Sequence, residues 1–257
     1  LATGLALSEA DVLKGRERIS AMRAEKLPDA AVLLQALLTR LAPEQVVFSS
    51  WGLREGLLYD RLPAHTKAQD PLLAGVAVFA SQRGSAPTLA TRMAAWTLDA
   101  APAREHGSER LRLAATMLAL AAMQIEPNIR LPQAINWALH KRWVGIDGKG
   151  RAMLAAAIAA NGNQLNLPAE VRALACPEAI DEAVCWGLAL RLARRLGGQS
   201  ARSLEVSRLR VEEGTLVLEL AASHAALFGA PTEKDMKLLA GRLGIGWRVD
   251  IVDEIVM

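Results

Sequence analysis

The sequence predicts a mainly α-helical protein with α/β segments at its two ends. Alanine and leucine dominate a chain of 257 residues in which aromatic side chains make up only 4%, and both residues lose little side-chain entropy in a helix. Apolar residues recur at helical spacing through the middle of the chain, whereas segments near both ends are short, β-branched or alternating. With 52% hydrophobic side chains the protein can bury at least one full core.

Two helices and a strand are expected first. A capping-box pattern that starts at Ser8 predicts a helix over 8–25, and Pro28 suits the first turn of a second helix. That second helix is expected to be buried because it carries an apolar face, made of Val32, Leu33, Leu37 and Leu41. Residues 43–50, "PEQVVFSS", then predict a buried strand, and "GLLYDRL" reads as its partner or as a helix start.

A polar linker after Pro63 leads into a separate helical unit. Glycine, proline and asparagine divide this unit into short segments, so neighbouring helices are expected to pack on one another. The predicted helices are 72–81, 89–98, 108–123, 131–141, 150–160, 168–173 and 177–196.

The C-terminal segment changes to strand periodicity. "SLEVSRLRV" (203–211) and "TLVLELA" (215–221) alternate apolar with polar residues around a Glu213-Gly214 turn, which predicts an antiparallel hairpin. A helix over 232–244 and a last strand over 245–253 follow. The sequence therefore predicts a small β-β-α-β module.

The stretch "SSWGLREGLLYD" places two charges in a turn after the first predicted strand. The guanidinium of Arg54 could present its donor fork to a phosphate or carboxylate, and Glu55 could orient that arginine or hold a metal-bound water. Alternatively the two residues form an ordinary ion pair that ties the turn to a helix. Spacing alone leaves the choice open.

The run "VVFSSWGLREGLLYD" resembles the end of the second actin-like (ribonuclease H-like) domain in the Ppx/GppA family of exopolyphosphatases and guanosine-pentaphosphate phosphatases. The shared motif comprises Ser50, Gly52, Arg54, Glu55 and Gly56. The resemblance implies three parts: 1–62 as the end of the actin-like domain, 63–199 as an HD-like all-helical domain, and 200–257 as the α/β module.

The resemblance also implies an activity that this chain is not expected to have alone. Family members hydrolyse the terminal phosphate of inorganic polyphosphate or guanosine pentaphosphate with Mg²⁺, using Gly-rich phosphate loops that precede this region. No such loop occurs here, so we expect a C-terminal portion without catalytic residues, with Mg²⁺ bound mainly elsewhere. A start at Leu1 rather than methionine fits that expectation.

The HD-like domain is expected to lack its metal residues. Where relatives carry an Asp, a His-Pro-Asp and a His, this sequence reads Leu120, Glu126-Pro127-Asn128 and Gly148. The remaining candidates, His106, His140 and Asp147, are spaced too loosely for a metal site. His140 is interpreted as a surface or partly buried histidine.

Basic residues complete the candidate site. Lys141 and Arg142 precede the "VGIDGKG" loop and are expected, with Arg54 and Glu55, to contact substrate, because a polyanion is attracted to clustered positive charge. Arg191, Arg194 and Arg195 form a second cluster, for which favourable interaction with a helix C-terminus is the alternative.

Partners and compartment follow from the remaining features. The tryptophans are expected mostly in the core, so no specific nucleic-acid binding is predicted. No apolar run reaches the length of a membrane span and no signal peptide is evident, so a cytoplasmic protein is expected. A homodimer is expected, and a polyanion-binding and dimerisation module without hydrolytic role is the alternative function.

Overall fold

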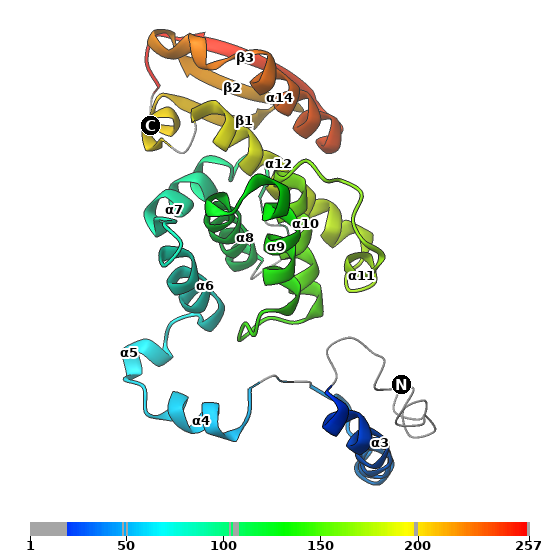
Figure 1. Ribbon diagram of the computed structural model, residues 1–257. Helices are drawn as coiled ribbons and strands as arrows, with labels where there is room; N and C mark the ends of the chain where they lie inside the picture. The colour runs from blue at the N-terminus through cyan, green and yellow to red at the C-terminus, as the bar shows by residue number, and fades with distance from the viewer. Residues whose placement is uncertain are drawn as a thin grey trace. The chain divides into compact units, whose positions relative to one another are not determined.

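A computed structural model describes residues 20–47, 49, 51–102, 104, 108–197 and 200–255 (Figure 1). The chain divides into two compact units, Leu1–Ser50 and Trp51–Met257. Helices dominate both, and one three-stranded sheet lies near the C-terminus. The expectation of a mainly helical chain with a small α/β module is confirmed.

The first unit contains one described helix, α3 (Ala21–Leu41). The break predicted between two helices at Pro28 is wrong, because α3 continues through that proline. Most of the helix predicted over 8–25 lies outside the described residues. The apolar face expected to be buried is exposed, since the described part of this unit offers no second helix or sheet to cover it; its members are Val32, Leu33, Leu37 and Leu41.

The strand predicted over 43–50 does not form in the described part of that segment. Residues 43–47 are irregular, and Val47 is 77% exposed. A β-strand needs a neighbouring strand to satisfy its backbone groups, and none is described in this unit. The β-branched pattern is therefore present without the partner that a strand requires.

The second unit has a helical core built around two neighbouring helices in its centre, α10 (Gly148–Asn161) and α12 (Pro177–Gly197) (Figure 1). Every residue of α10 from Ala152 to Asn161 is buried. A Cβ on Gly187 of α12 would lie only 2.1 Å from the carbonyl oxygen of Ala157, so glycine is required for this close approach. Small residues thus let the two backbones pack tightly.

Most of the other helices lie around this pair, at or near their predicted positions (Figure 1). The prediction of a polar linker after Pro63 is corrected in part, because residues 64–67 form a short helix. Prolines at the first turn move the starts of three helices towards the N-terminus relative to the prediction. The elements are α4 (Leu53–Asp60), α5 (Ala64–Lys67), α6 (Pro71–Ser81), α7 (Pro87–Trp96), α8 (Glu109–Ala121), η1 (Ala122–Gln124), α9 (Pro127–His140) and α11 (Ala169–Arg172).

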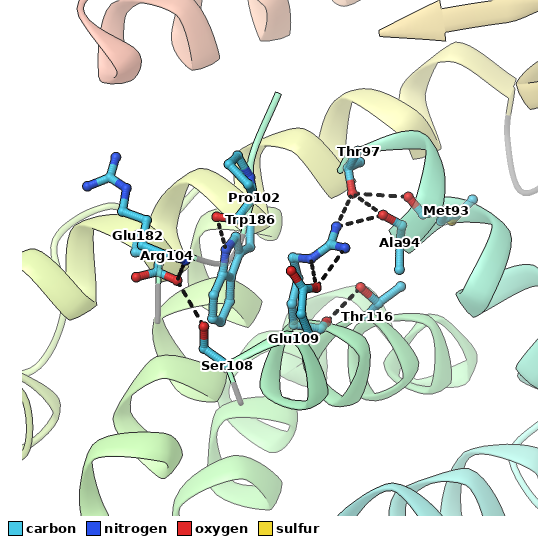
Figure 2. A network of polar contacts seen from close by, with 11 residues as sticks. Met93, Ala94, Thr97, Pro102, Arg104, Ser108, Glu109, Thr116, Glu182 and Trp186 are labelled. Atoms are coloured by element: carbon cyan, nitrogen blue, oxygen red, sulfur yellow. Dashed lines mark hydrogen bonds and ion pairs between the residues drawn. The ribbon is translucent and has the colours of Figure 1, made fainter. Parts of the chain in front are cut away.

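A buried polar network joins three of these helices (Figure 2). Arg112 of α8 is 6% exposed and donates to the carbonyl oxygen of Ala94 and to Thr97 Oγ1, while its ion-pair partner is Glu109. Glu182 of α12 accepts hydrogen bonds from the backbone N–H of Arg104 and from Ser108 Oγ. Since buried charge is tolerated only when paired, this network fixes α8 between α7 and α12.

The C-terminal module contains the predicted β-β-α-β order. Strand β1 (Ser207–Glu212) pairs antiparallel with the central strand β2 (Thr215–Ala221), and β2 pairs in parallel with β3 (Gly246–Val252) across the helix α14 (Ala230–Leu243). The first strand starts later than predicted, because Ser200 caps a short helix, α13 (Ala201–Glu205), through a hydrogen bond to the backbone N–H of Arg202. A 3-10 segment, η2 (Ala222–Leu227), follows β2.

Among the described helices none combines the length and the apolar character that a bilayer crossing demands.

Candidate functional site

The charged turn predicted from the sequence is the N-terminus of helix α4. Gly52 is its N-cap, in extended conformation, and donates its backbone N–H to Glu55 Oε2 at 2.9 Å. Glu55 therefore acts first as a capping residue, returning to the start of its own helix. The Arg54 side chain is 87% exposed, and its Nη2 lies 3.6 Å from Glu55 Oε1. The ion pair between the two residues is present, and the Arg54 guanidinium faces solvent.

Glu55 is held in its ionised form. The backbone N–H of Gly52 lowers the pKa of its carboxyl group below the ordinary 4.5, the residue's own N–H adds to this, and Arg54 and Arg142 contribute further. Hydrogen bonds to a carboxylate favour its charged form. The turn therefore presents a fixed negative charge between two arginines at neutral pH.

Arg142 contacts this turn although it lies 91 residues after Trp51 in the sequence. The indole N–H of Trp51 donates to the backbone carbonyl oxygen of Arg142 at 3.3 Å, and the Arg142 guanidinium lies 5.7 Å from the centre of the Trp51 ring. Its Nη2 is 4.0 Å from Glu55 Oε1. Three of the four predicted substrate-binding residues, Arg54, Glu55 and Arg142, thus lie together.

Lys141, the fourth predicted residue, lies over a different aromatic group. Its ammonium nitrogen is 4.6 Å from the centre of the Phe79 ring and 5.3 Å from that of Trp143. Both rings belong to the hydrophobic core. The Lys141 ammonium group is therefore positioned by cation–π contact with core rings, and it does not join the ion pairs of the turn that are described.

Trp51 is the residue of this site that the sequence did not predict. It was grouped with core tryptophans, and Trp137, Trp143 and Trp186 are indeed buried, yet Trp51 is 45% exposed. Its position in the sequence could have revealed it. Trp51 directly precedes the N-cap of a helix whose first turn is charged, and a residue at such a position is not expected in the core.

The group has a positive excess that can attract an oxyanion. Two guanidinium groups, those of Arg54 and Arg142, lie beside the single carboxylate of Glu55. Because Arg54 and Arg142 are well exposed, their attraction for a phosphate chain would be screened by salt. The arrangement suits binding and orientation of phosphate groups.

This group does not fit a magnesium ion by itself. Mg²⁺ prefers several oxygen ligands in octahedral geometry, and the Glu55 carboxylate already accepts from Gly52 and lies beside two guanidinium groups. Nowhere in the described ranges do three His, Cys, Asp or Glu side chains gather as metal ligands would.

The other candidate site residues in the described ranges occupy a surface position or make structural hydrogen bonds. His140 is exposed at the end of α9, as interpreted, and Asp147 caps α10 by accepting from the backbone N–H of Gly150 at 2.7 Å. Arg151 donates to carbonyl oxygens at the C-terminus of α9, including that of Leu139 at 3.1 Å. His106 lies outside the described residues.

The second arginine cluster lies on α12 and pairs with α14. Asp235, 1% exposed, accepts from Arg191 Nε at 2.7 Å and from Arg195 Nε at 3.1 Å. Arg194 instead donates from Nη1 to Asn161 Oδ1 at 2.8 Å. Two of these arginines are thus paired with a carboxylate of another helix. Interaction with the C-terminus of α12 and with solvent is therefore not a complete description of the cluster.

Comparisons with known proteins identify two family models that match this chain. Residues 73–250 match the family model described as exopolyphosphatase, C-terminal, and residues 14–65, which include the α4 turn, match that of the Ppx/GppA phosphatase family. A comparison with curated proteins found no match. The two family matches confirm the resemblance carried by the Ser50–Gly56 motif. The chain therefore belongs to the Ppx/GppA phosphatase family.

Proposed function

We propose that this chain is the C-terminal portion of an exopolyphosphatase-like phosphatase that removes the terminal phosphate from inorganic polyphosphate or guanosine pentaphosphate. The order of the two family matches supports this, since residues 14–65 precede 73–250 as the end of a catalytic region precedes a C-terminal one. In this proposal 1–62 completes an actin-like domain, 63–199 is an HD-like domain, and 200–257 is the α/β module.

The observation that carries the proposal is the exposed Arg54 guanidinium at the N-terminus of α4. Glu55 lies beside both Arg54 and Arg142, so a guanidinium pair with a net positive charge faces solvent within the segment that matches the phosphatase family. A planar guanidinium donates two parallel hydrogen bonds to phosphate oxygens. Arg54 would bind phosphate, and Glu55 would orient it.

The reaction is attack of water on the terminal phosphorus, in line with the leaving phosphate oxygen. Charge develops on the phosphoryl oxygens, and arginine donors stabilise it without accepting or releasing a proton. The family-implied Mg²⁺ would be held by residues outside the α4 group. Because this group supplies donors but no set of metal-ligand oxygens, the chain alone is proposed to be inactive, and the longer protein to be the enzyme.

The test is phosphate release from long-chain polyphosphate with Mg²⁺, by a longer protein that contains this chain and by the 257-residue chain alone. Arg54→Gln in the longer protein should lower kcat/KM about tenfold or more, the loss of one charge-assisted hydrogen bond to phosphate. Arg61→Gln, at the exposed C-terminus of the same helix, is the matched control and should retain activity. Equal losses in both variants would contradict a specific role for Arg54.

A binding and dimerisation module without hydrolytic role is the second candidate. Between Leu72 and Leu98 only Val78 and Leu98 are large apolar side chains exposed to solvent, which argues against an interface there. Helix α4 favours one instead, because it exposes a run of large side chains: Leu53, Leu57, Leu58 and Tyr59. Sedimentation of the chain with Leu57→Glu, against the parent, tests this: a dimer in the parent that becomes a monomer in the variant supports it.

A further inference from the structure

A cavity of about 240 Å³ lies within the helical core, remote in sequence from the α4 turn. Helices α8, α9, α10 and α12, which run side by side in Figure 1, contribute to its wall together with η1. Pockets for drug-sized ligands range from about 300 to 1,000 Å³, so this one suits a smaller molecule. The polar residues of its lining are Arg130, Asn161, Arg191 and Arg194, and the rest of the lining is apolar or glycine.

Arg194 is the central polar residue of this cavity. Its Nη1 donates to Asn161 Oδ1 at 2.8 Å, across from α12 to α10. Its Nε is buried and has no hydrogen-bond partner among the described residues. Because a buried donor without an acceptor is costly, an arginine in this state is suited to an acceptor that enters the cavity.

Two further arginines are held rigidly at the same wall. Arg130 donates from Nε and Nη2 to the carbonyl oxygen of Ile125, at 3.1 and 2.9 Å, which leaves its Nη1 donors for another acceptor. The Nε of Arg191 is fixed by an ion pair with Asp235, which does not line the cavity. Both side chains are therefore preorganised rather than mobile, and preorganisation lowers the cost of binding.

The charges at the cavity are unbalanced. Three arginines line it, and its lining contains no carboxylate; Asp235 lies behind Arg191 and is shared with Arg195. Burial, with smaller contributions from the neighbouring Arg130, Arg191 and Arg195, lowers the pKa of the Arg194 guanidinium to about 10. An anion in the cavity would compensate the positive charges of these arginines, which repel one another.

We propose that this cavity binds a phosphate group, either as free orthophosphate or on a small phosphorylated compound. Three guanidinium groups and the amide of Asn161 offer donors from several directions, which matches a tetrahedral dianion with four acceptor oxygens better than a planar carboxylate. The small volume excludes a long polymer. The site does not depend on the proposed hydrolytic function, because none of its residues belongs to the α4 turn.

The experiment is calorimetric titration of the 257-residue chain with orthophosphate and, separately, with glycerol phosphate, at constant ionic strength and with chloride as the reference anion. Arg194→Met keeps most of the apolar stem and removes the donors, and should weaken phosphate binding about tenfold or more. Arg195→Met is the matched control, because Arg195 lies on the same helix and pairs with Asp235 but does not line the cavity. It should change the affinity less than about twofold.

Asn161→Asp gives an independent test that removes no arginine. The new carboxylate would pair with Arg194 in the place of the amide oxygen, so phosphate binding should be lost while circular dichroism shows an unchanged helical fold. Tighter binding of orthophosphate than of glycerol phosphate would assign the site to the free anion, and the reverse order to a phosphorylated compound. Absence of binding by the parent chain, or equal losses in Arg194→Met and Arg195→Met, would overturn the proposal.

Discussion

Two groups of arginines in this protein surround a carboxylate, and they differ in exposure. At the α4 turn, Arg54 and Arg142 lie 3.6 and 4.0 Å from Glu55 in contact with solvent. In the helical core, Arg191 and Arg195 bind the buried Asp235 at 2.7 and 3.1 Å, and Arg194 of the same helix donates to Asn161 instead. Water screens the first group more than the second, because Arg54 is 87% exposed whereas Asp235 is 1% exposed. The same residue types therefore form a solvated surface in one place and a largely buried ion-pair cluster in the other.

The largest effect is expected from Asp235→Asn. This change leaves Arg191 and Arg195 facing each other without the buried carboxylate that pairs with both, and breaking a buried pair by removing one partner costs about 3–5 kcal/mol. Urea unfolding at pH 7 measures the loss. Glu233→Gln is the control, because Glu233 makes an exposed i,i+4 pair with Lys237 on the same helix and should cost less than about 0.5 kcal/mol. Similar losses in both variants would remove the distinction between the two groups.

A smaller effect is expected at the helix crossing that shapes the inner pocket. Gly187→Ala places a methyl group against the carbonyl oxygen of Ala157, which forces α10 and α12 apart and should cost about 1–3 kcal/mol. Gly241→Ala in α14 is the control, since its Cβ meets nothing within 4 Å and should stabilise the helix by about 0.5–1 kcal/mol.

Thermal or urea unfolding of both glycine variants gives the comparison. Asn161 lies on α10 and Arg194 on α12, so moving these helices apart should also weaken phosphate binding at the pocket of Gly187→Ala. A Gly187→Ala protein as stable as the parent would mean that the crossing adapts more readily than its geometry suggests.

The smallest effect is expected at the exposed turn and depends on pH. The pKa of Glu55 is lowered in the folded chain, chiefly by the Gly52 N–H, so its contribution to stability is present above its ordinary pKa of 4.5 and is lost as the pH falls through the lower folded value. Glu55→Gln should therefore speed amide hydrogen exchange in α4 at pH 7. The difference from the parent should vanish well below pH 4.5, and a difference that persists there would exclude the ionised cap as its cause.

Much of the fold could be predicted because local patterns and tertiary packing agree there. The helices of the second unit and the strands around the Glu213-Gly214 turn have clear periodicities, and both are found. One failure occurs where a pattern lacks its partner: Val46 and Val47 have strand propensity, but no strand is described beside them. The other is at Pro28, which lies inside α3 and does not separate two helices. Serine capping at Ser200 outweighed the alternation that predicted a strand from Ser203.

The candidate site was predictable only in its local part. The spacing of Arg54 and Glu55 revealed one half, but the approach of Arg142 to Trp51 depends on tertiary structure. The inner pocket is less accessible to sequence reasoning. Arg191, Arg194 and Arg195 lie near one another on a helix, whereas Arg130, Asn161 and Asp235 join them from three other helices.

The central claim is that the two arginine groups serve different phosphate chemistry, and a crossed pair of variants tests it most directly. Polyphosphate hydrolysis would be measured in the longer protein and orthophosphate binding in this chain, each with Arg54→Gln and with Arg194→Met. The account predicts that Arg54→Gln lowers hydrolysis and leaves orthophosphate binding intact, and that Arg194→Met does the reverse. If either variant lowers both quantities to the same degree, the two groups are not separate sites and the account is contradicted.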